Sequence, residues 1–448
     1  MIPAESFQTF SLRAAQQGQS IARILAAAVN AVEPGKAVGR FVQRDGDTLT
    51  VSDRAYDLSA FRRVVLLGIG KAAVSMSAAL AEILGNHLSE GLVIKKHAPI
   101  ILHPPLTIIQ GNHPVPGDDS LLAGKKATEL LSTLSPDDLL FCMISGGGSA
   151  LMTAPVEGVT LSDLQALTSD LLACGARIDE INTLRRHLDR VKGGGIAKMA
   201  NGARIINLVL SDVVGNPLAA IASGPTAPDP TERIEALSIL TKYKLEEQTS
   251  PSIIHALRTL PEIPKPGDPI FEKVQNVLVG SNLLAAQAAL RQAEEEGFHP
   301  YLLRTDLQGE ARKATHELVN FLRQVRQTGN PVPAPACIVA GGETTVTLHG
   351  DGKGGRNTEL ALAAVNELAE LSGVWLVTLA TDGEDGPTDA AGAVVTAETF
   401  RRAVELGLNP GDFLERNDSY SFFATLGDLL RPGSTGTNVN DLTFMFLF

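Results

Sequence analysis

Three charged side chains of this sequence lie where apolar runs give way to glycine or polar residues. Lys71 and Asp212 each follow such a run, and Arg356 follows two glycines. An ammonium group stabilises negative charge, a carboxylate accepts a proton or holds Mg²⁺, and a guanidinium grips a carboxylate through two parallel hydrogen bonds. The pattern predicts Lys71, Asp212 and Arg356 as catalytic residues. A solvated lysine, a turn aspartate and a surface ion pair are the alternatives.

Glycine-rich turns are the second feature, and they account for much of the excess in a chain with 42 glycines. Without a Cβ, glycine lets backbone amides approach a ligand, and a turn that opens a helix favours an anion. Close packing of a helix on a strand is the alternative, although a helix C-cap would explain only one of three glycines at 193–195. The residues that we predict to bind substrate or phosphate in these turns are Gly70, Ser145, Gly146, Gly147, Gly148, Ser149, Lys192, Gly193 and Gly194.

An acidic loop at residues 381–389 carries four carboxylates in nine positions. Its spacing is not that of a calcium loop, but it could coordinate Mg²⁺ or orient an arginine. We predict roles for Asp382 and Asp385 in substrate or phosphate binding, and we take Asp212 and Asp382 as candidate metal ligands. His113, in a loop rich in proline, is predicted to bind substrate as well. A solvated acidic turn and a structural histidine are the alternatives.

Charge and hydropathy exclude several classes of protein. Lys and Arg number 38 and Asp and Glu number 50, so the net charge is 38 − 50 = −12, which argues against non-specific binding to nucleic acid or to an anionic membrane. No apolar run reaches the length of a spanning helix. The three cysteines show no zinc spacing, and Cys142 and Cys337, which lie in apolar runs, are typical of buried thiols in a reducing compartment. We therefore expect a cytoplasmic protein that is a monomer or a homodimer.

Short apolar runs alternate with segments of helical period through the first half of the 448 residues. This alternation is typical of a parallel sheet covered on both faces, and the length favours two domains. Prolines concentrate between residues 225 and 269, which predicts the interdomain connection. The expected organisation is α/β, with an N-terminal Rossmann-like domain at residues 1–235, a connecting segment at 236–270 and a smaller α/β domain at 271–448.

A dinucleotide site is the first alternative to consider, because Gly68-x-Gly70-x-x-Ala73 follows a predicted strand. Such a site also needs an acidic residue at the end of the next strand, where it binds the ribose hydroxyls. The next predicted strand ends instead in Lys95-Lys96. An NAD-dependent enzyme is therefore disfavoured, although the lysines could tolerate the phosphate of NADP.

Taken in order, the motifs of the chain resemble those of the glycerate 2-kinase family, in which a glycerate-kinase domain precedes a MOFRL domain. The resemblance covers nearly the whole chain from about residue 20. One departure is Thr358, where the family pattern has glutamine. The segments that carry the resemblance are 68–72, 111–114, 144–150, 182–183, 192–195, 210–215, 223–226, 280–282, 340–344, 354–357 with Glu359, 381–386 and 435–441.

This resemblance implies a kinase that uses ATP and a divalent cation such as Mg²⁺ to phosphorylate the 2-hydroxyl of D-glycerate. It implies two α/β domains with the active site in the cleft between them. It also implies roles in substrate or phosphate binding for Asn282, Glu343 and Asn357, which lie in the matching segments. D-glycerate is the expected partner, and neither nucleic acid nor a membrane is expected.

Two rival functions stay open from the sequence. One is an NAD(P)-dependent hydroxypyruvate reductase, a label that some relatives carry, and the argument from Lys95-Lys96 weighs against it. The other is a sensor that binds sugar acids without catalysis. A sensor has less need of three dissimilar charged groups, which favours the kinase.

Overall fold

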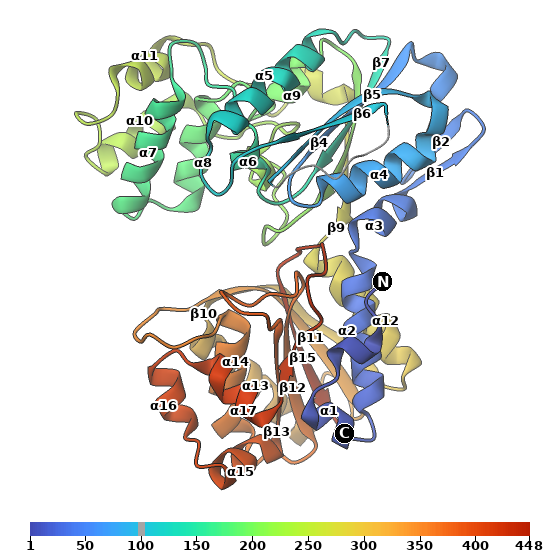
Figure 1. The fold of residues 1–448 in the computed structure, drawn as a ribbon, viewed down its shortest axis with the longest axis vertical. Helices are drawn as coiled ribbons and strands as arrows, with labels where there is room; N and C mark the ends of the chain where they lie inside the picture. The colour runs from blue at the N-terminus through green and yellow to red at the C-terminus, as the bar shows by residue number, and fades with distance from the viewer. Residues whose placement is uncertain (97–103) are drawn as a thin grey trace. The chain divides into compact units, whose positions relative to one another are not determined.

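Two compact units form the chain in the computed structural model, which describes residues 1–96 and 104–448. Unit 1 contains Met1–Glu33 and Gly280–Phe448, and unit 2 contains Pro34–Val279 (Figure 1). This division differs from the expected one. The first 33 residues fold with the C-terminal part of the chain, and the predicted connecting segment at 236–270 lies inside unit 2.

A six-stranded sheet forms the centre of unit 2, in the order β6-β5-β4-β7-β8-β9. The pairs β4–β5, β4–β7, β5–β6 and β7–β8 are parallel. Counted along the chain, this order is 3-2-1-4-5-6, the doubly wound arrangement in which ligands bind where the order reverses. That point lies between β4 and β7. The strands are β4 (Arg63–Ile69), β5 (Leu88–Lys95), β6 (Leu106–Gln110), β7 (Asp138–Ile144), β8 (Arg204–Leu210) and β9 (Val274–Gly280).

Helices cover both faces of this sheet because its central strands are apolar on both sides. All seven residues of β7 are buried. Helix α4 (Ala73–Leu84) packs on β4 and β5. Buried side chains of α5 (Asp118–Ser132) and α9 (Gly195–Met199) form a core with alternate residues of the strands.

A helical cluster extends unit 2 beyond the sheet. Leucine and isoleucine side chains from α7, α8, α10 and α11 form its core, and much of the predicted connecting segment is in these helices. The remaining helices of unit 2 are α3 (Pro34–Phe41), α6 (Gly148–Leu151), α7 (Leu161–Ala173), α8 (Ile178–His187), α10 (Arg233–Lys242) and α11 (Pro251–Thr259), and a small antiparallel sheet comprises β1 (Val42–Asp45), β2 (Thr48–Val51) and β3 (Arg54–Asp57).

Unit 1 contains a mixed sheet in the order β10-β11-β15-β12-β13-β14. Strand β15 runs antiparallel to both β11 and β12, so those two strands end at the edge where β15 begins. Asp441, the first residue of β15, is in register with Gly342 on one side and Ala380 on the other. The strands are β10 (His299–Glu310), β11 (Ala336–Thr345), β12 (Val374–Ala380), β13 (Gly392–Thr396), β14 (Leu429–Leu430) and β15 (Asp441–Leu447).

Helices of unit 1 come from both ends of the chain. Helix α2 near the N-terminus packs on α12, and α14 packs on α13 (Figure 1). The α-helices of unit 1 are α1 (Phe10–Ala14), α2 (Gly18–Ala31), α12 (Asn282–Glu295), α13 (Ala311–Thr328), α14 (Arg356–Leu368), α15 (Ala397–Glu405), α16 (Pro410–Glu415) and α17 (Ser419–Leu426). Short 3₁₀ helices in the described parts of both units lie at Ala4–Phe7, Leu58–Ala60, Gly85–His87, Ile221–Ser223 and Pro269–Lys273. The predicted class, two α/β domains of which the first is Rossmann-like, is confirmed.

Candidate functional site

Three neighbouring strands of unit 2 bring predicted residues together at their carboxyl ends. The Lys71 amide, after β4, donates to the Gly146 carbonyl, after β7, at 3.0 Å. Asp212 follows β8, and its carboxylate comes so close to Gly146 that a Cβ on that glycine would lie 2.0 Å from Oδ2. Because parallel strands end at one edge, the order of the sheet places all three loops side by side.

Gly70 and Ser145 hold the first two of these loops against each other. Gly70 adopts φ +124°, and a Cβ there would lie 2.3 Å from Ser145 Oγ and 2.5 Å from its carbonyl oxygen. Ser145 Oγ in turn accepts a hydrogen bond from the Ala72 amide at 3.0 Å. Both residues therefore shape the turn that presents Lys71. The side chain of Lys71 itself is exposed.

His113 lies beside this group, as its loop after β6 suggested. A Cβ on Gly147 would lie 3.1 Å from the His113 ring and 3.6 Å from Lys71 Cγ. Burial lowers the pKa of His113, and the positive charges of Lys71 and Lys96 lower it further. The imidazole is accordingly held neutral near pH 7, so that it can offer a hydrogen bond to a ligand but adds no charge.

The turn at 145–149 has open backbone amides. Within residues 1–96 and 104–448, the amides of Gly146 and Gly147 have no hydrogen-bond acceptor. Gly147 adopts φ +82°, which glycine tolerates, and precedes α6. Gly148 donates to the Ser145 carbonyl at 3.4 Å, so its amide is less available. The open amides beside Lys71 give this turn the character of an anion nest.

The turn at 192–195 differs from that expectation. The amides of Gly193 and Gly194 donate to the carbonyls of Ser223 and Gly224 at 3.0 and 2.8 Å. A Cβ on Gly194 would lie 2.9 Å from the Phe271 ring. These glycines are therefore required for close packing, the alternative that the sequence left open, and their amides are not open to a phosphate.

Lys192 is also placed differently from the prediction. Its side chain is only 4% exposed, and its ammonium pairs with Asp189 and with the Met152 carbonyl. Burial lowers the pKa of Lys192, and Asp189 partly offsets that effect. We leave Lys192, Gly193 and Gly194 out of the site proposed below.

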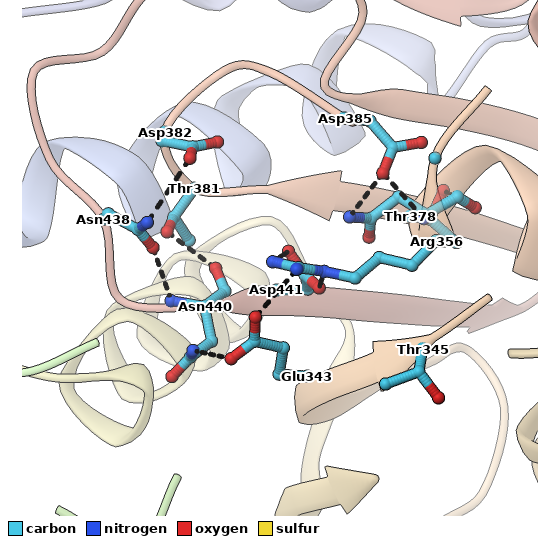
Figure 2. A network of polar contacts seen from close by, with 12 residues as sticks. Glu343, Thr345, Arg356, Thr378, Thr381, Asp382, Asp385, Asn438, Asn440 and Asp441 are labelled. Atoms are coloured by element: carbon cyan, nitrogen blue, oxygen red, sulfur yellow. Dashed lines mark hydrogen bonds and ion pairs between the residues drawn. The ribbon is translucent and has the colours of Figure 1, made fainter. Parts of the chain in front are cut away.

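A second group of predicted residues lies in unit 1, around the first residue of α14 (Figure 2). The Arg356 guanidinium donates from Nε and Nη2 to the two oxygens of Asp441 at 2.5 and 3.3 Å. From Nη1 it donates to Glu343 Oε1 at 2.7 Å, and Asn440 Nδ2 donates to Glu343 Oε2 at 2.9 Å. Three of the five guanidinium N–H groups are thereby used, which leaves 5 − 3 = 2 for a ligand.

Burial and charge pairing shift the pKa values of this group in opposite directions. Burial raises the pKa of Asp441 to about 6, and the neighbouring Arg356 charge offsets that effect only in part. For Arg356, burial favours the neutral form, but Asp441 and Glu343 outweigh it and raise its pKa. Arg356 is therefore always charged, while Asp441 titrates near neutrality.

Asp385 and Asn357 support the start of α14. Asp385 accepts hydrogen bonds from the amides of Asn357 and Thr358 at 2.9 and 2.8 Å, and from the Thr358 hydroxyl at 2.7 Å. Burial raises the pKa of Asp385, and these hydrogen bonds oppose the shift. The pair caps the helix whose first residue is Arg356, so it positions the guanidinium. Thr358, where the family pattern has glutamine, contributes to this cap.

Asn282 and Asp382 complete the predicted set. Asn282 is buried, and its Nδ2 donates to the carbonyls of Val439 and Asp441 at 3.0 and 2.9 Å. Its role is to hold the start of β15. Asp382 accepts from the Glu384 amide at 3.1 Å and lies near the start of the loop that follows β12.

Metal binding by protein side chains alone has no support in the described residues. They contain no group of three or more His, Cys, Asp or Glu side chains placed to hold an ion. The candidate ligands Asp212 and Asp382 belong to different units. An Mg²⁺ ion that arrives with a polyphosphate needs only one or two carboxylates, since phosphate oxygens and water complete its shell. Asp212 and Asp382 can each supply one such carboxylate.

Sequence reasoning missed Asp441 and Asn440. Both occur in the segment 435–441 that carries the resemblance, yet neither was given a role. A signal was present, since the segment Asn-Val-Asn-Asp immediately precedes the apolar run 442–447. Its importance depends on β15 lying between β11 and β12, which the order of the sequence does not reveal.

Two α/β units, one with an anion nest beside a lysine and the other with an arginine between carboxylates, define an enzyme class that handles anionic substrates. Residues 20–258 match a domain of unknown function, DUF4147, and residues 336–441 match the MOFRL family. Both matches agree with the domains that the motifs resemble.

Two curated relatives from distant organisms carry names for glycerate 2-kinase activity, and a third carries a different name. A glycerate 2-kinase of Pyrococcus horikoshii is 38% identical over 94% of this chain and 95% of its own. A D-glycerate 2-kinase of Thermotoga maritima is 41% identical over 85% and 89%. A relative from Agrobacterium vitis, 38% identical over 85% of this chain and 86% of its own, carries a name for hydroxypyruvate reduction.

The fold is shared as well. A crystal structure titled glycerate kinase from Thermotoga maritima superposes with a TM-score of 0.86, at 38% identity over 95% of this chain and 98% of that one. The chain belongs to the glycerate kinase family composed of a DUF4147 and a MOFRL domain, which confirms the resemblance.

No helix in the described parts of the chain is both long enough and apolar enough to cross a membrane.

Proposed function

We propose that this protein is a glycerate 2-kinase, which transfers the γ-phosphoryl group of ATP to the 2-hydroxyl of D-glycerate and releases 2-phosphoglycerate and ADP. The observation that carries the proposal is the similarity to two relatives of that name, at 38 and 41% identity over 94 and 85% of the chain. The chemistry of the two groups of residues supports it.

In unit 2, Lys71 and the open amides of Gly146 and Gly147 stabilise phosphoryl oxygens. Phosphoryl transfer depends mainly on positioning and on charge stabilisation, and an ammonium beside open amides supplies both. Asp212, next to Gly146, accepts the proton of the attacking hydroxyl. His113 stays neutral and donates or accepts one hydrogen bond.

In unit 1, Arg356 binds the carboxylate of glycerate through its two remaining N–H groups. A guanidinium whose other donors are fixed by carboxylates loses little conformational entropy when it binds, and a pair of parallel hydrogen bonds is directional. That Arg356 serves the same reaction as Lys71 and Asp212 stays a prediction from sequence.

ATP and a divalent cation are the further components of this proposal. Mg²⁺ would be held by the phosphates, water and a carboxylate, for which Asp212 and Asp382 are the candidates. When bound, the cation neutralises charge on the transferring group. The residues of the chain orient the phosphates and the acceptor hydroxyl.

The proposal predicts ADP release that depends on D-glycerate and no oxidation of NADPH with hydroxypyruvate. The end of β5 at Lys95 agrees with the second expectation, because a dinucleotide site needs an acidic residue there. A coupled ADP assay measures the first, phosphorus NMR fixes the phosphorylated position, and absorbance at ~340 nm follows the cofactor. NADPH oxidation without glycerate-dependent ADP release would contradict the proposal.

Substitution of Gly146 tests the contact that places Asp212. In Gly146→Ala, the new methyl group would lie 2.0 Å from Asp212 Oδ2, so the carboxylate must move. We expect kcat to fall about tenfold or more, because small displacements of a reacting group are costly. Steady-state kinetics measure this, with Gly39→Ala as the control, since a Cβ at Gly39 meets nothing within 4 Å. Equal kcat values for both variants would separate Asp212 from the chemistry.

A further inference from the structure

A second cation of unit 2 lines a cavity in which it has no counter-charge. The cavity, of about 30 Å³, lies between α7 and α8 and extends to Ser149, two residues after the open Gly147 amide. Its charged lining residues are Arg185, Lys192 and Asp189, so its formal charge is +2 − 1 = +1. No part of the site described above uses Arg185.

Asp189 cannot serve as the missing partner of Arg185. Its Oδ2 accepts from Lys192 and from the Thr153 hydroxyl, the latter at 2.6 Å, and its Oδ1 accepts from the amides of Ala154 and Val191, both at 3.1 Å. Lys192 is thus neutralised in place. The excess charge of the cavity belongs to Arg185.

The guanidinium of Arg185 makes no hydrogen bond or ion pair within residues 1–96 and 104–448, although the residue is partly buried. Burial lowers the pKa of its guanidinium, and its proximity lowers the pKa of Lys192 as well. Burying a guanidinium without a carboxylate partner costs free energy, and a bound anionic ligand offsets that cost. The next residue shows the contrast, because Arg186 pairs with Asp229 at 3.0 Å.

The rest of the lining limits what the cavity can hold. Ser149 Oγ shares a hydrogen bond of 2.8 Å with Ser223 Oγ, which gives the polar end a hydroxyl. The opposite walls are apolar, with Leu164, Leu167 and Leu171 from α7 and Leu184 from α8. A volume of about 30 Å³ admits two or three water molecules, which is the scale of a carboxylate or of the oxygens of one phosphate, and is too small for a purine base.

We propose that Arg185 and Ser149 form an oxyanion-binding subsite beside the turn at 145–149, which receives a carboxylate or phosphate oxygen of a substrate. Charge-assisted hydrogen bonds are strong where water is excluded, and Arg185 supplies two parallel donors. The oxyanion has two possible sources, the glycerate carboxylate and the phosphates of ATP. In naming these two sources the inference rests on the proposed function.

Isothermal titration tests the subsite without relying on turnover. D-glycerate and ATP are titrated separately into the full chain, as wild type, Arg185→Ala, Arg185→Lys and the control Arg258→Ala. Arg258 on α11 is exposed and likewise has no partner in the described residues. We expect Arg185→Ala to weaken one of the two ligands about tenfold or more, Arg185→Lys to weaken it less, and the control to bind both as wild type does.

The ligand that is weakened identifies the source. Loss confined to D-glycerate assigns the subsite to the carboxylate, and loss confined to ATP assigns it to a phosphate. The inference is overturned if both Arg185 variants bind both ligands as wild type does, or if wild type binds neither. Failure of the proposed function has a different signature, since wild type would then release no ADP with D-glycerate even where Arg185→Ala weakens an anion.

Discussion

Alanine at Lys71 or at Asp212 is expected to lower kcat by about 10²–10³, an effect comparable to the loss of one oxyanion-stabilising donor. In the proposed mechanism, Lys71 stabilises charge on the phosphoryl group and Asp212 accepts the proton of the acceptor hydroxyl. The Lys71 side chain is exposed, so its removal should leave the thermal midpoint unchanged within a few degrees. Steady-state kinetics and thermal unfolding of the same preparations measure both quantities.

Lys126→Ala is the matched control for Lys71. Lys126 is an exposed lysine on α5 in the same unit, and among the described residues it pairs with Glu129 alone, on its own helix, at 2.9 Å. Its loss should change neither kcat nor stability. An Asp212→Ala variant that keeps near-normal kcat across the pH range would remove Asp212 as the base, and Asp382 in the loop after β12 would be the next candidate.

The strand-end positions of Lys71, Asp212 and His113 could be predicted because the alternation of apolar runs and helices along the chain largely determines where the strands end. Apolar runs that alternate with helices imply a parallel sheet, and parallel strands end at one edge. Glycine between such a run and a polar residue then marks the turn that faces a ligand. For this reason the sequence predicts Lys71 and Asp212 in strand-end turns at the carboxyl edge of a parallel sheet.

The packing of the turn at 192–195 and the role of Asp441 beside Arg356 could not be predicted, for two physical reasons. Three consecutive glycines are required equally by an anion nest and by close packing, and only the donors of Gly193 and Gly194 distinguish the two. Asp441 depends on an antiparallel strand from the end of the chain inserted between two earlier strands. Long-range pairing of this kind has no local signal.

The two compact units differ from the expected domain bounds for a related reason. Prolines between residues 225 and 269 predict a linker, but Leu240, Ile253 and Leu257 in that segment are buried in the core of the helical cluster. Proline marks the ends of helices as well as the joints between domains. The N-terminal α2 packs on α12, far along the chain, and periodicity cannot identify the partner of an amphipathic helix.

Arg356→Lys is expected to raise KM for D-glycerate about 10- to 10²-fold, and to raise KM for ATP less. Lysine keeps the charge but cannot reach Asp441 and Glu343 and still present two parallel donors. Arg401→Lys is the control, because Arg401 also bonds two carboxylates, Glu398 and Glu405, on the exposed surface of α15. A rise in KM for ATP alone would make Arg356 a phosphate-binding residue and reverse the assignment of the substrates.

Asp441→Asn distinguishes orientation of Arg356 from a purely structural role. Burial raises the pKa of Asp441 to about 6, above its value in an unfolded chain, so its ionisation costs stability as the pH rises through about 6. At about pH 8 the variant should therefore be no less stable than wild type. Its kcat/KM should nevertheless be lower, because asparagine cannot take both Nε and Nη2 of Arg356. Wild type should lose kcat/KM as the pH falls through about 6 and Asp441 is protonated, whereas the variant should lack that acid limb. Identical pH profiles in the two proteins would show that this carboxylate does not orient the arginine.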